Sequence, residues 1–306
     1  MQVTDTILMV RPAAFDFNEE TAVNNSFQNR SSLLKTDLQT KALSQFDGMV
    51  NTLIVKGVEV LVVNDTKEPT KPDAVFPNNW FSTNADGGLF VFPMFARNRR
   101  FEKRDDILLA LKQKFRIEKF QDWTEYEAEA MYLEGTGSMV MDHKNKIIYA
   151  CLSPRTHHTL LEKFAATNGY RAIAFTAENE KAIPIYHTNV MMSVGDGFSV
   201  VCPKVIPDYT ERIAVTQLLE ATGHENIYIE PDLLKNFAAN LLQVKNKNGN
   251  LFIAISKTAV DTFPKSKLNQ LEKYGELLPI DVSVIEKVNG GSVRCMIAEI
   301  FLPPIN

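Results

Sequence analysis

The sequence predicts an α/β fold in which five strand-strand-helix-strand units close into a ring. Short apolar segments typical of strands recur in pairs split by turn residues, and a segment with the apolar spacing of a helix follows each pair. The starts of these pairs align at Asn79, Gly137, Asn189, Asn240 and Ser292, which gives steps of 58, 52, 51 and 52 residues by subtraction. Each unit exposes a strand edge and an apolar face, and a ring with its helices outside covers both.

The first three units each contain two hairpin strands, a helix and a third strand. Their expected ranges, in this order, are 80–82, 89–92, 105–115 and a strand near Ile117; 138–141, 147–151, 157–168 and 170–175; and 190–194, 198–202, 208–222 and 227–229. The fourth unit has strands at 241–244 and 251–256 and a helix at 265–274. The fifth is shared between the two ends of the chain, with a strand at 293–301 followed by a strand at 6–10, a helix at 36–55 and a strand at 58–63.

The composition is that of an ordinary globular protein. The 306 residues carry a net charge of −4, and 45% of them are hydrophobic and 23% charged. An apolar fraction of this size can build a sizeable core, which argues against disorder. Because no linker rich in proline, glycine or serine interrupts the series of units, we expect residues 1–306 to form a single domain.

Charge, hydropathy and cysteine spacing exclude several functional classes. Slight acidity argues against a nucleic-acid partner, and a solvated helix start explains the short basic cluster at 97–104. No apolar run approaches the roughly 18 residues of a membrane span, and the N-terminus lacks the pattern of a leader, so we predict a cytoplasmic protein without membrane contact. The wide spacing of Cys151, Cys202 and Cys295 predicts reduced thiols and no metal site.

Three residues at the hairpin starts have the chemistry of a thiol-dependent catalytic site. In a ring of pseudo-symmetric units these starts converge at one end of the symmetry axis, and Glu134, His187 and Cys295 occupy them in three different units. A cysteine nucleophile needs a nearby proton carrier, and a carboxylate holds cationic groups in place. Each residue alone is weak support, since a free cysteine is most often buried and inert. Their shared register therefore carries the prediction.

Three segments resemble the signatures of the guanidino-group-modifying enzymes, also called penteins: 133–137 (LEGTG), 187–189 (HTN) and 290–295 (GGSVRC). Segments 9–12 (MVRP) and 76–82 (FPNNWFS) make the chain similar to the amidinotransferase-related group linked to citrulline utilisation. The resemblance implies a five-bladed α/β propeller of pseudo-symmetric ββαβ units, which agrees with the repeat found in the sequence.

The resemblance also implies a covalent mechanism. Cys295 is the expected nucleophile, His187 the general acid and base, and Glu134 the carboxylate that binds the nitrogens of the substrate. The thiolate attacks the planar carbon of a guanidinium or ureido group, His187 protonates the departing amine, and water then releases the thio-intermediate. This mechanism requires no metal and no organic cofactor.

The expected substrate contacts come from Phe76, Asn79, Asn189 and Arg155. Arg155 lies in a segment similar to one whose arginine grips the α-carboxylate of the substrate, and it either makes this contact or begins a helix. Arginine deiminases resemble the chain but carry aspartates at the positions of Asn79 and Asn189. Neutral amides weaken the preference for a cation, which makes a neutral ureido group such as that of citrulline plausible. Superfamily members that release two ammonias from one guanidine also carry asparagine here, so arginine is an equal alternative.

The leading hypothesis is a cysteine-dependent hydrolase of carbon–nitrogen bonds in linear amidines or ureido amino acids, with a small-molecule substrate. One alternative is an amidinotransferase that passes the amidino group to an amine. Another is a non-catalytic binding protein with the same fold. The oligomeric state stays open, a homo-oligomer included. The polar segment 18–32 is either a lid over the site or a surface loop, and its composition favours the loop.

Overall fold

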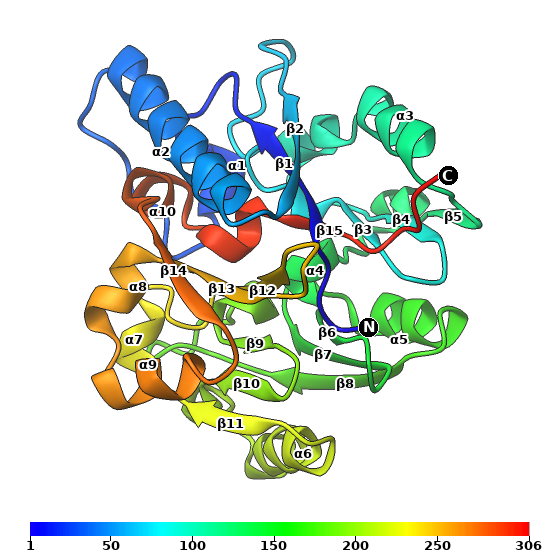
Figure 1. The fold of residues 1–306 in the computed structure, drawn as a ribbon, viewed down its shortest axis with the longest axis vertical. Helices are drawn as coiled ribbons and strands as arrows, with labels where there is room; N and C mark the ends of the chain where they lie inside the picture. Colours follow the sequence, from blue (N-terminus) through cyan, green and yellow to red (C-terminus); the bar gives the residue numbers. More distant parts are fainter. Residues whose placement is uncertain (306) are drawn as a thin grey trace.

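The computed structural model describes residues 1–305, which form five three-stranded sheets. In every sheet the first two strands are antiparallel, and the third strand is parallel to the second. The longer helices lie at the periphery and the strands lie toward the centre (Figure 1). The predicted α/β class and the five-fold repeat of ββαβ units are confirmed.

The sheets follow one another along the chain, and the last one joins the two ends. Their strands, grouped by sheet, are β3 (Phe81–Thr83), β4 (Gly88–Val91) and β5 (Lys119–Asp122); β6 (Val140–Asp142), β7 (Ile147–Leu152) and β8 (Arg171–Thr176); β9 (Met192–Val194), β10 (Phe198–Val201) and β11 (Glu225–Tyr228); β12 (Leu242–Lys245), β13 (Leu251–Ser256) and β14 (Glu276–Ile280); and β15 (Ala298–Ile300), β1 (Thr6–Arg11) and β2 (Glu59–Asn64).

The helices are short apart from α2 and α6. The α-helices are α1 (Glu19–Ala22), α2 (Lys35–Val55), α3 (Asp105–Lys114), α4 (Gly135–Ser138), α5 (His158–Thr167), α6 (Tyr209–Ala221), α7 (Pro231–Leu234), α8 (Lys257–Thr262), α9 (Lys265–Leu271) and α10 (Ser283–Asn289). The 3₁₀ helices are η1 (Pro77–Asn79), η2 (Arg97–Glu102), η3 (Thr124–Glu129), η4 (Thr188–Val190), η5 (Pro203–Val205) and η6 (Val293–Met296). Among residues 1–305, no helix has both the length and the apolar character that crossing a bilayer requires.

The fifth unit closes the ring by pairing the two ends of the chain. Strand β15 runs antiparallel to β1, with Thr6 opposite Ile300 and Leu8 opposite Ala298. Strand β2 then lies parallel to β1 on its other side. This is the closure that the sequence predicts for the strands at its two ends.

Helix α2 shows why the helices cover the outside of the sheets. Its apolar side chains at three- and four-residue spacing are all buried: Leu38, Ala42, Phe46, Met49 and Leu53. They pack in one cluster with residues of β1 and β14, while most of the polar side chains of the helix lie on its other faces. Burial of each large side chain of this stripe contributes about 1.5–3 kcal/mol, which fixes the helix on the sheet.

Two sequence predictions differ from the observed elements. A strand was expected at 293–301, but only β15 is a strand, because residues 293–296 form η6. In this turn the backbone N–H of Cys295 donates to the carbonyl of Ser292 at 3.0 Å. The sequence predicted no third strand in the fourth unit, where the structure has β14. Pro279 argues against a strand, but β14 pairs only with β13 in its sheet, and such an edge position tolerates proline.

Candidate active site

Short turns, rather than the strands themselves, carry the polar residues at the start of each hairpin. Four of these turns are η1, α4, η4 and η6, and the fourth unit has an irregular turn that ends at Asn240. In that turn Phe237 takes up a left-handed backbone conformation with φ of 59°. A turn can direct neighbouring side chains into the ring, whereas a strand would point successive side chains to opposite faces of its sheet.

Residues at the hairpin starts of the first, third and fifth units line one buried cavity. Its lining residues are Asn25, Asp73, Phe76, Asn79, Arg99, Arg155, Tyr186, His187, Asn289, Gly291 and Cys295. Five of the seven candidate residues are in this set, while Glu134 contacts the cavity through His187, and Asn189 contacts it through Cys295. The structure therefore brings all seven candidates together. The cavity has a volume of about 10 Å³, which is close to the room that one water needs, so the site is closed.

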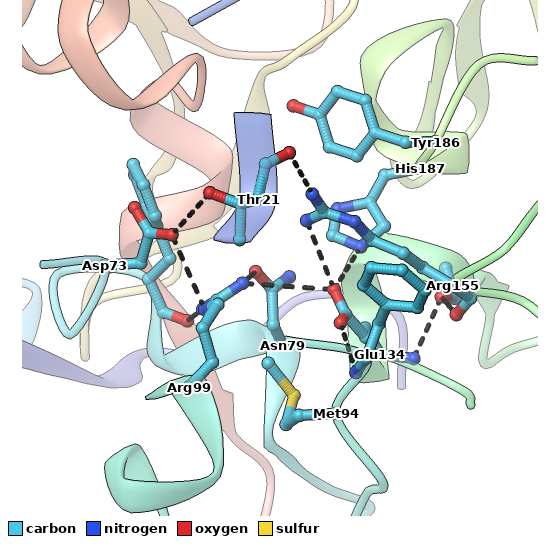
Figure 2. A network of polar contacts seen from close by, with 12 residues as sticks. Thr21, Asp73, Asn79, Met94, Arg99, Glu134, Arg155, Tyr186 and His187 are labelled. Carbon is cyan, nitrogen blue, oxygen red and sulfur yellow. Dashed lines mark hydrogen bonds and ion pairs between the residues drawn. The ribbon is translucent and has the colours of Figure 1, made fainter. Parts of the chain in front are cut away.

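Glu134 lies at the centre of the polar network, between two arginines (Figure 2). One carboxylate oxygen lies 2.8 Å from Nε2 of His187, 3.5 Å from Nη1 of Arg155 and 3.9 Å from Nη1 of Arg99. The other accepts the backbone N–H of Phe95 at 3.0 Å. A fully buried carboxylate is stable in this position because donors and positive charges surround it.

The same network sets the protonation states of the pair. Burial alone would raise the pKa of Glu134, but Arg155, His187 and Arg99 outweigh burial and lower this pKa to about 2. Burial lowers the pKa of His187 to about 4, against the opposing effect of Glu134. At neutral pH the pair therefore consists of a charged carboxylate and a neutral imidazole, and that imidazole is able to accept a proton.

This pair should make the protein less stable in acid. The pKa of His187 falls from 6.5 in the unfolded chain to about 4 in the folded one, so the unfolded chain binds more protons and stability falls as the pH drops through this window. Linkage gives a loss of about 3 kcal/mol at pH 4. Chemical denaturation between pH 7 and pH 4 should therefore show a smaller loss for His187→Asn than for the wild type. Equal losses in the two proteins would contradict the assignment.

The glycines of segment 133–137 allow the turns to approach closely. A Cβ atom on Gly137 would lie 2.7 Å from Nδ1 of His187 and would also collide with the amide of Asn79. Gly135 has a positive φ of 46°, and a Cβ atom there would strike the backbone of Asn78. These two glycines therefore let three of the turns meet at the cavity.

Arg155 points into the cavity and has partners on the other side of it. Its guanidinium stacks 4.8 Å over the ring of Tyr186, and it donates to the carbonyl of Thr21 at 3.1 Å and to Oδ1 of Asn24 at 2.9 Å. Helix α5 begins three residues later, at His158. Arg155 therefore does not begin the helix, and its buried side chain lines the cavity.

Part of segment 18–32 covers the site, which corrects the expectation of a surface loop. Asn18, Thr21 and Asn25 are buried, and Asn25 lines the cavity. Nδ2 of Asn18 donates to Asp73 at 2.7 Å, and Nδ2 of Asn25 donates to the carbonyl of Asn289 at 3.0 Å. Polar composition suggested a loop, but these amides are polar because they bond to polar groups inside the protein.

Arg99 is a site residue that sequence reasoning missed. It lies in the basic cluster at 97–104 that was interpreted as a solvated helix start, yet it is 2% exposed. Its guanidinium binds both carboxylate oxygens of Glu102 at 2.8 Å and donates to Oδ1 of Asn79 at 2.9 Å. The only local signal was the spacing of Arg99 and Glu102 by one helical turn.

Asp73 and Asn289 were missed as well. The carboxylate of Asp73 accepts the hydroxyl of Thr21 at 3.2 Å and the side-chain amide of Asn289, and it lies 3.9 Å from Nε of Arg99. Neither residue occupies a hairpin start, so the repeat did not single them out.

Within residues 1–305, no group of three or more histidine, cysteine, aspartate or glutamate side chains is arranged to hold a metal ion.

A family model for eukaryotic N,N-dimethylarginine dimethylhydrolases matches residues 11–302 of the chain. The chain belongs to the dimethylarginine dimethylhydrolase family. The matched range contains every candidate residue of the site, from Phe76 to Cys295. No curated protein sequence matches this member of the dimethylarginine dimethylhydrolase family.

Solved structures share its fold at low sequence identity. ArgZ, an arginine dihydrolase from cyanobacteria, has a TM-score of 0.75 and 17% identity over 98% of this chain, which spans 41% of that protein. The substrate-bound N-terminal domain of ArgZ has a TM-score of 0.74 and 16% identity, with 97% of this chain and 98% of that domain covered. Dimethylarginine dimethylhydrolase from Pseudomonas aeruginosa, complexed with citrulline, has a TM-score of 0.65 and 14% identity, with 97% and 100% covered. These likenesses confirm the five-bladed pentein fold for this family member.

Proposed function

We propose that this chain is a cysteine-dependent hydrolase that cleaves a carbon–nitrogen bond in the guanidino or ureido group of an arginine-like amino acid, and that residues 1–306 act as a single catalytic domain. The observation that carries the proposal is the convergence of a thiol, a neutral imidazole and a buried carboxylate on one closed cavity. Family membership supports the same chemistry, because the family is named after the hydrolysis of dimethylarginine. The three free thiols suit a reducing compartment, which supports a cytoplasmic location.

The charges of the cavity match an amino acid with a free carboxylate and a free ammonium group. Arg155 offers a guanidinium for the carboxylate, and Asp73 offers a carboxylate for the ammonium. Thr21 lies between them, because its carbonyl accepts from Arg155 and its hydroxyl donates to Asp73 (Figure 2). Helix α1 must therefore move aside, at least in part, for a substrate of this size to enter the cavity.

The proposed reaction begins when neutral His187 takes the thiol proton of Cys295. The sulfur then forms a bond to the planar carbon, the carbon–nitrogen bond breaks, and protonated His187 gives its proton to the departing amine. In the second half, His187 takes a proton from water as the water oxygen attacks the same carbon. The carbon–sulfur bond then breaks, and the sulfur leaves as a thiolate that takes the proton back from His187, so the thiol and the neutral imidazole re-form. The negative charge of Glu134 stabilises the imidazolium at each stage.

Asn79 and Asn189 support a substrate that carries both N–H groups and an oxygen. Arg99 can only donate, so Oδ1 of Asn79 faces it and Nδ2 of Asn79 is left as a buried donor within the described structure. Nδ2 of Asn189 faces the sulfur of Cys295, which leaves its Oδ1 as a buried acceptor. A ureido group carries an oxygen that suits a donor such as Nδ2 of Asn79 and N–H groups that suit an acceptor such as Oδ1 of Asn189. Two-step hydrolysis of arginine suits both amides as well, because its intermediate is a ureido compound.

The test is product analysis with arginine, its ω-methylated derivatives, citrulline and agmatine. Release of ammonia or an alkylamine from at least one amino acid substrate is expected, with agmatine much poorer because it offers Arg155 no carboxylate. An amidinotransferase would need added glycine or another amine to form product. Folded protein that releases nothing from any of these compounds would contradict the proposed function.

Cys295 should be the most reactive of the three thiols. Burial raises the pKa of the Cys151 thiol to about 12 and that of the Cys202 thiol to about 12, so both stay protonated at pH 7. Cys295 is 5% exposed at a cavity, whereas the other two are completely buried. Iodoacetamide at pH 7 should modify Cys295 at least about ten times faster than the others, as measured by peptide mass spectrometry. Equally slow modification of all three would favour a non-catalytic binding protein.

A further inference from the structure

Asn240, which stands at the hairpin start of the fourth unit, is buried against the sulfur of Cys295. Its Nδ2 lies 3.2 Å from this sulfur and donates to the backbone carbonyl of Asn189 at 2.9 Å. Its Oδ1 accepts the backbone N–H of Arg294 at 3.0 Å. Because that N–H can only donate, the oxygen of the amide must face it, and the NH₂ group must face the sulfur.

The surroundings of Cys295 differ in hydrogen-bond type from those of the core thiol Cys151. The sulfur of Cys151 donates to the carbonyl of Ile185 at 3.4 Å, which is a contact that a thiol makes and a thiolate cannot make. The hydroxyl of Thr188 lies beside Cys151, but its proton is directed to the carbonyl of Ser138 at 2.5 Å. Cys151 is therefore held as a neutral thiol.

Two amide donors face Cys295 instead. Nδ2 of Asn240 is 3.2 Å away and Nδ2 of Asn189 is 3.5 Å away. The one acceptor that residues 1–305 place beside the sulfur, Oδ1 of Asn240, lies farther away at 3.7 Å and also accepts the backbone N–H of Arg294. Donors satisfy the lone pairs of a charged sulfur, whereas a neutral thiol needs an acceptor for its proton. The nucleophile is therefore surrounded by groups that favour its reactive form.

We propose that Asn240 is a further catalytic residue, which stabilises the thiolate of Cys295 by donating a hydrogen bond to the sulfur. The thiol proton leaves for His187 in this step, and the hydrogen bond holds the charge until the sulfur's electron pair forms the bond to carbon. When the carbon–sulfur bond later breaks, the same donor receives the returning charge. The turnover part of this inference rests on the proposed function, but the reactivity of the thiol can be measured without any substrate.

The experiment compares alkylation of Cys295 in the wild type, in Asn240→Asp and in Asn240→Ser. Aspartate keeps the shape and an acceptor for the N–H of Arg294 but replaces the donor with a negative charge. Site-resolved modification by iodoacetamide at pH 7 should slow at least about tenfold in both variants, and the rate should recover at higher pH. For a substrate that the wild type hydrolyses, kcat of both Asn240 variants should fall by a similar factor, while their KM should change little.

Asn246→Asp is the matched control. Asn246 is also a buried asparagine next to strand β12, its Oδ1 accepts backbone N–H groups, and its Nδ2 donates to the carbonyl of Lys56 at 3.0 Å, but it does not contact a sulfur. This variant should lose thermal stability without slower alkylation of Cys295.

Wild-type alkylation rates in a folded Asn240→Asp or Asn240→Ser protein would overturn the inference. So would equal slowing in Asn246→Asp, since that result would show a general effect of lost stability. Failure of the proposed function would be recognised separately, because the wild type would then release no product from any guanidino or ureido compound, whatever its alkylation rate.

Discussion

Replacing Cys295 with alanine should reduce kcat/KM by at least about 10³-fold for every substrate that the wild-type protein hydrolyses. Alanine has no nucleophile, so the covalent intermediate cannot form, and the substrate is only held in the cavity. The variant should still fold, because the side chain is small and its polar contacts are two amides that can take up water. Product release and thermal melting are the two measurements.

Cys202→Ala is the control for this substitution. Cys202 is completely buried in the core cluster that contains Met191 and Phe198 and does not line the cavity, so its loss should affect stability and leave turnover close to that of the wild type. Substantial residual activity in Cys295→Ala would refute the covalent mechanism. Mass spectrometry adds a direct check, since quenched wild-type enzyme should carry a substrate-derived adduct on Cys295.

The sequence could predict the ring and the central triad because both are encoded in regular spacing. Polar residues such as Glu134 and His187 interrupt apolar segments at a repeated position, and a repeated position in a ring of equal units becomes a shared place in space. The glycines of segment 133–137 added a second signal, since Gly137 permits the close approach of His187 and Gly135 that of the backbone of Asn78. Placement at or beside the cavity that follows from position in the repeat was thus within reach of the sequence.

Residues whose role depends on distant partners were not within reach. Arg99 and the exposed Arg97 look alike in the sequence. What distinguishes Arg99 is that its guanidinium is buried and bonds to the carboxylate of Glu102 and the amide of Asn79. The polar residue Asn18 likewise suggests a surface loop until Asp73, far along the chain, is found beside it. A polar side chain is equally polar in water and in a buried network, so sequence composition alone does not separate the two cases.

Replacing Arg99 with methionine should lower the free energy of unfolding by about 3–5 kcal/mol at pH 8, because it leaves the buried carboxylate of Glu102 without its partner. Burial already raises the pKa of Glu102 to about 7, against the opposing effect of Arg99, and loss of the arginine raises this pKa further. The folded variant then binds a proton that the unfolded chain, with its ordinary pKa of 4.5, does not bind. Its stability should therefore fall as the pH rises from 6 to 8.

The double variant Arg99→Met/Glu102→Gln separates this electrostatic cause from simple loss of packing. It removes the buried charge together with its partner, so it should recover much of the lost stability at pH 8 and lose the dependence on pH between 6 and 8. Urea denaturation at both pH values measures the wild type, Arg99→Met, Glu102→Gln and the double variant, which are the four proteins of the cycle. If the single and double variants were equally unstable at pH 8, the cost would lie in the contacts of Arg99 with Asn79 and Phe76 rather than in the carboxylate.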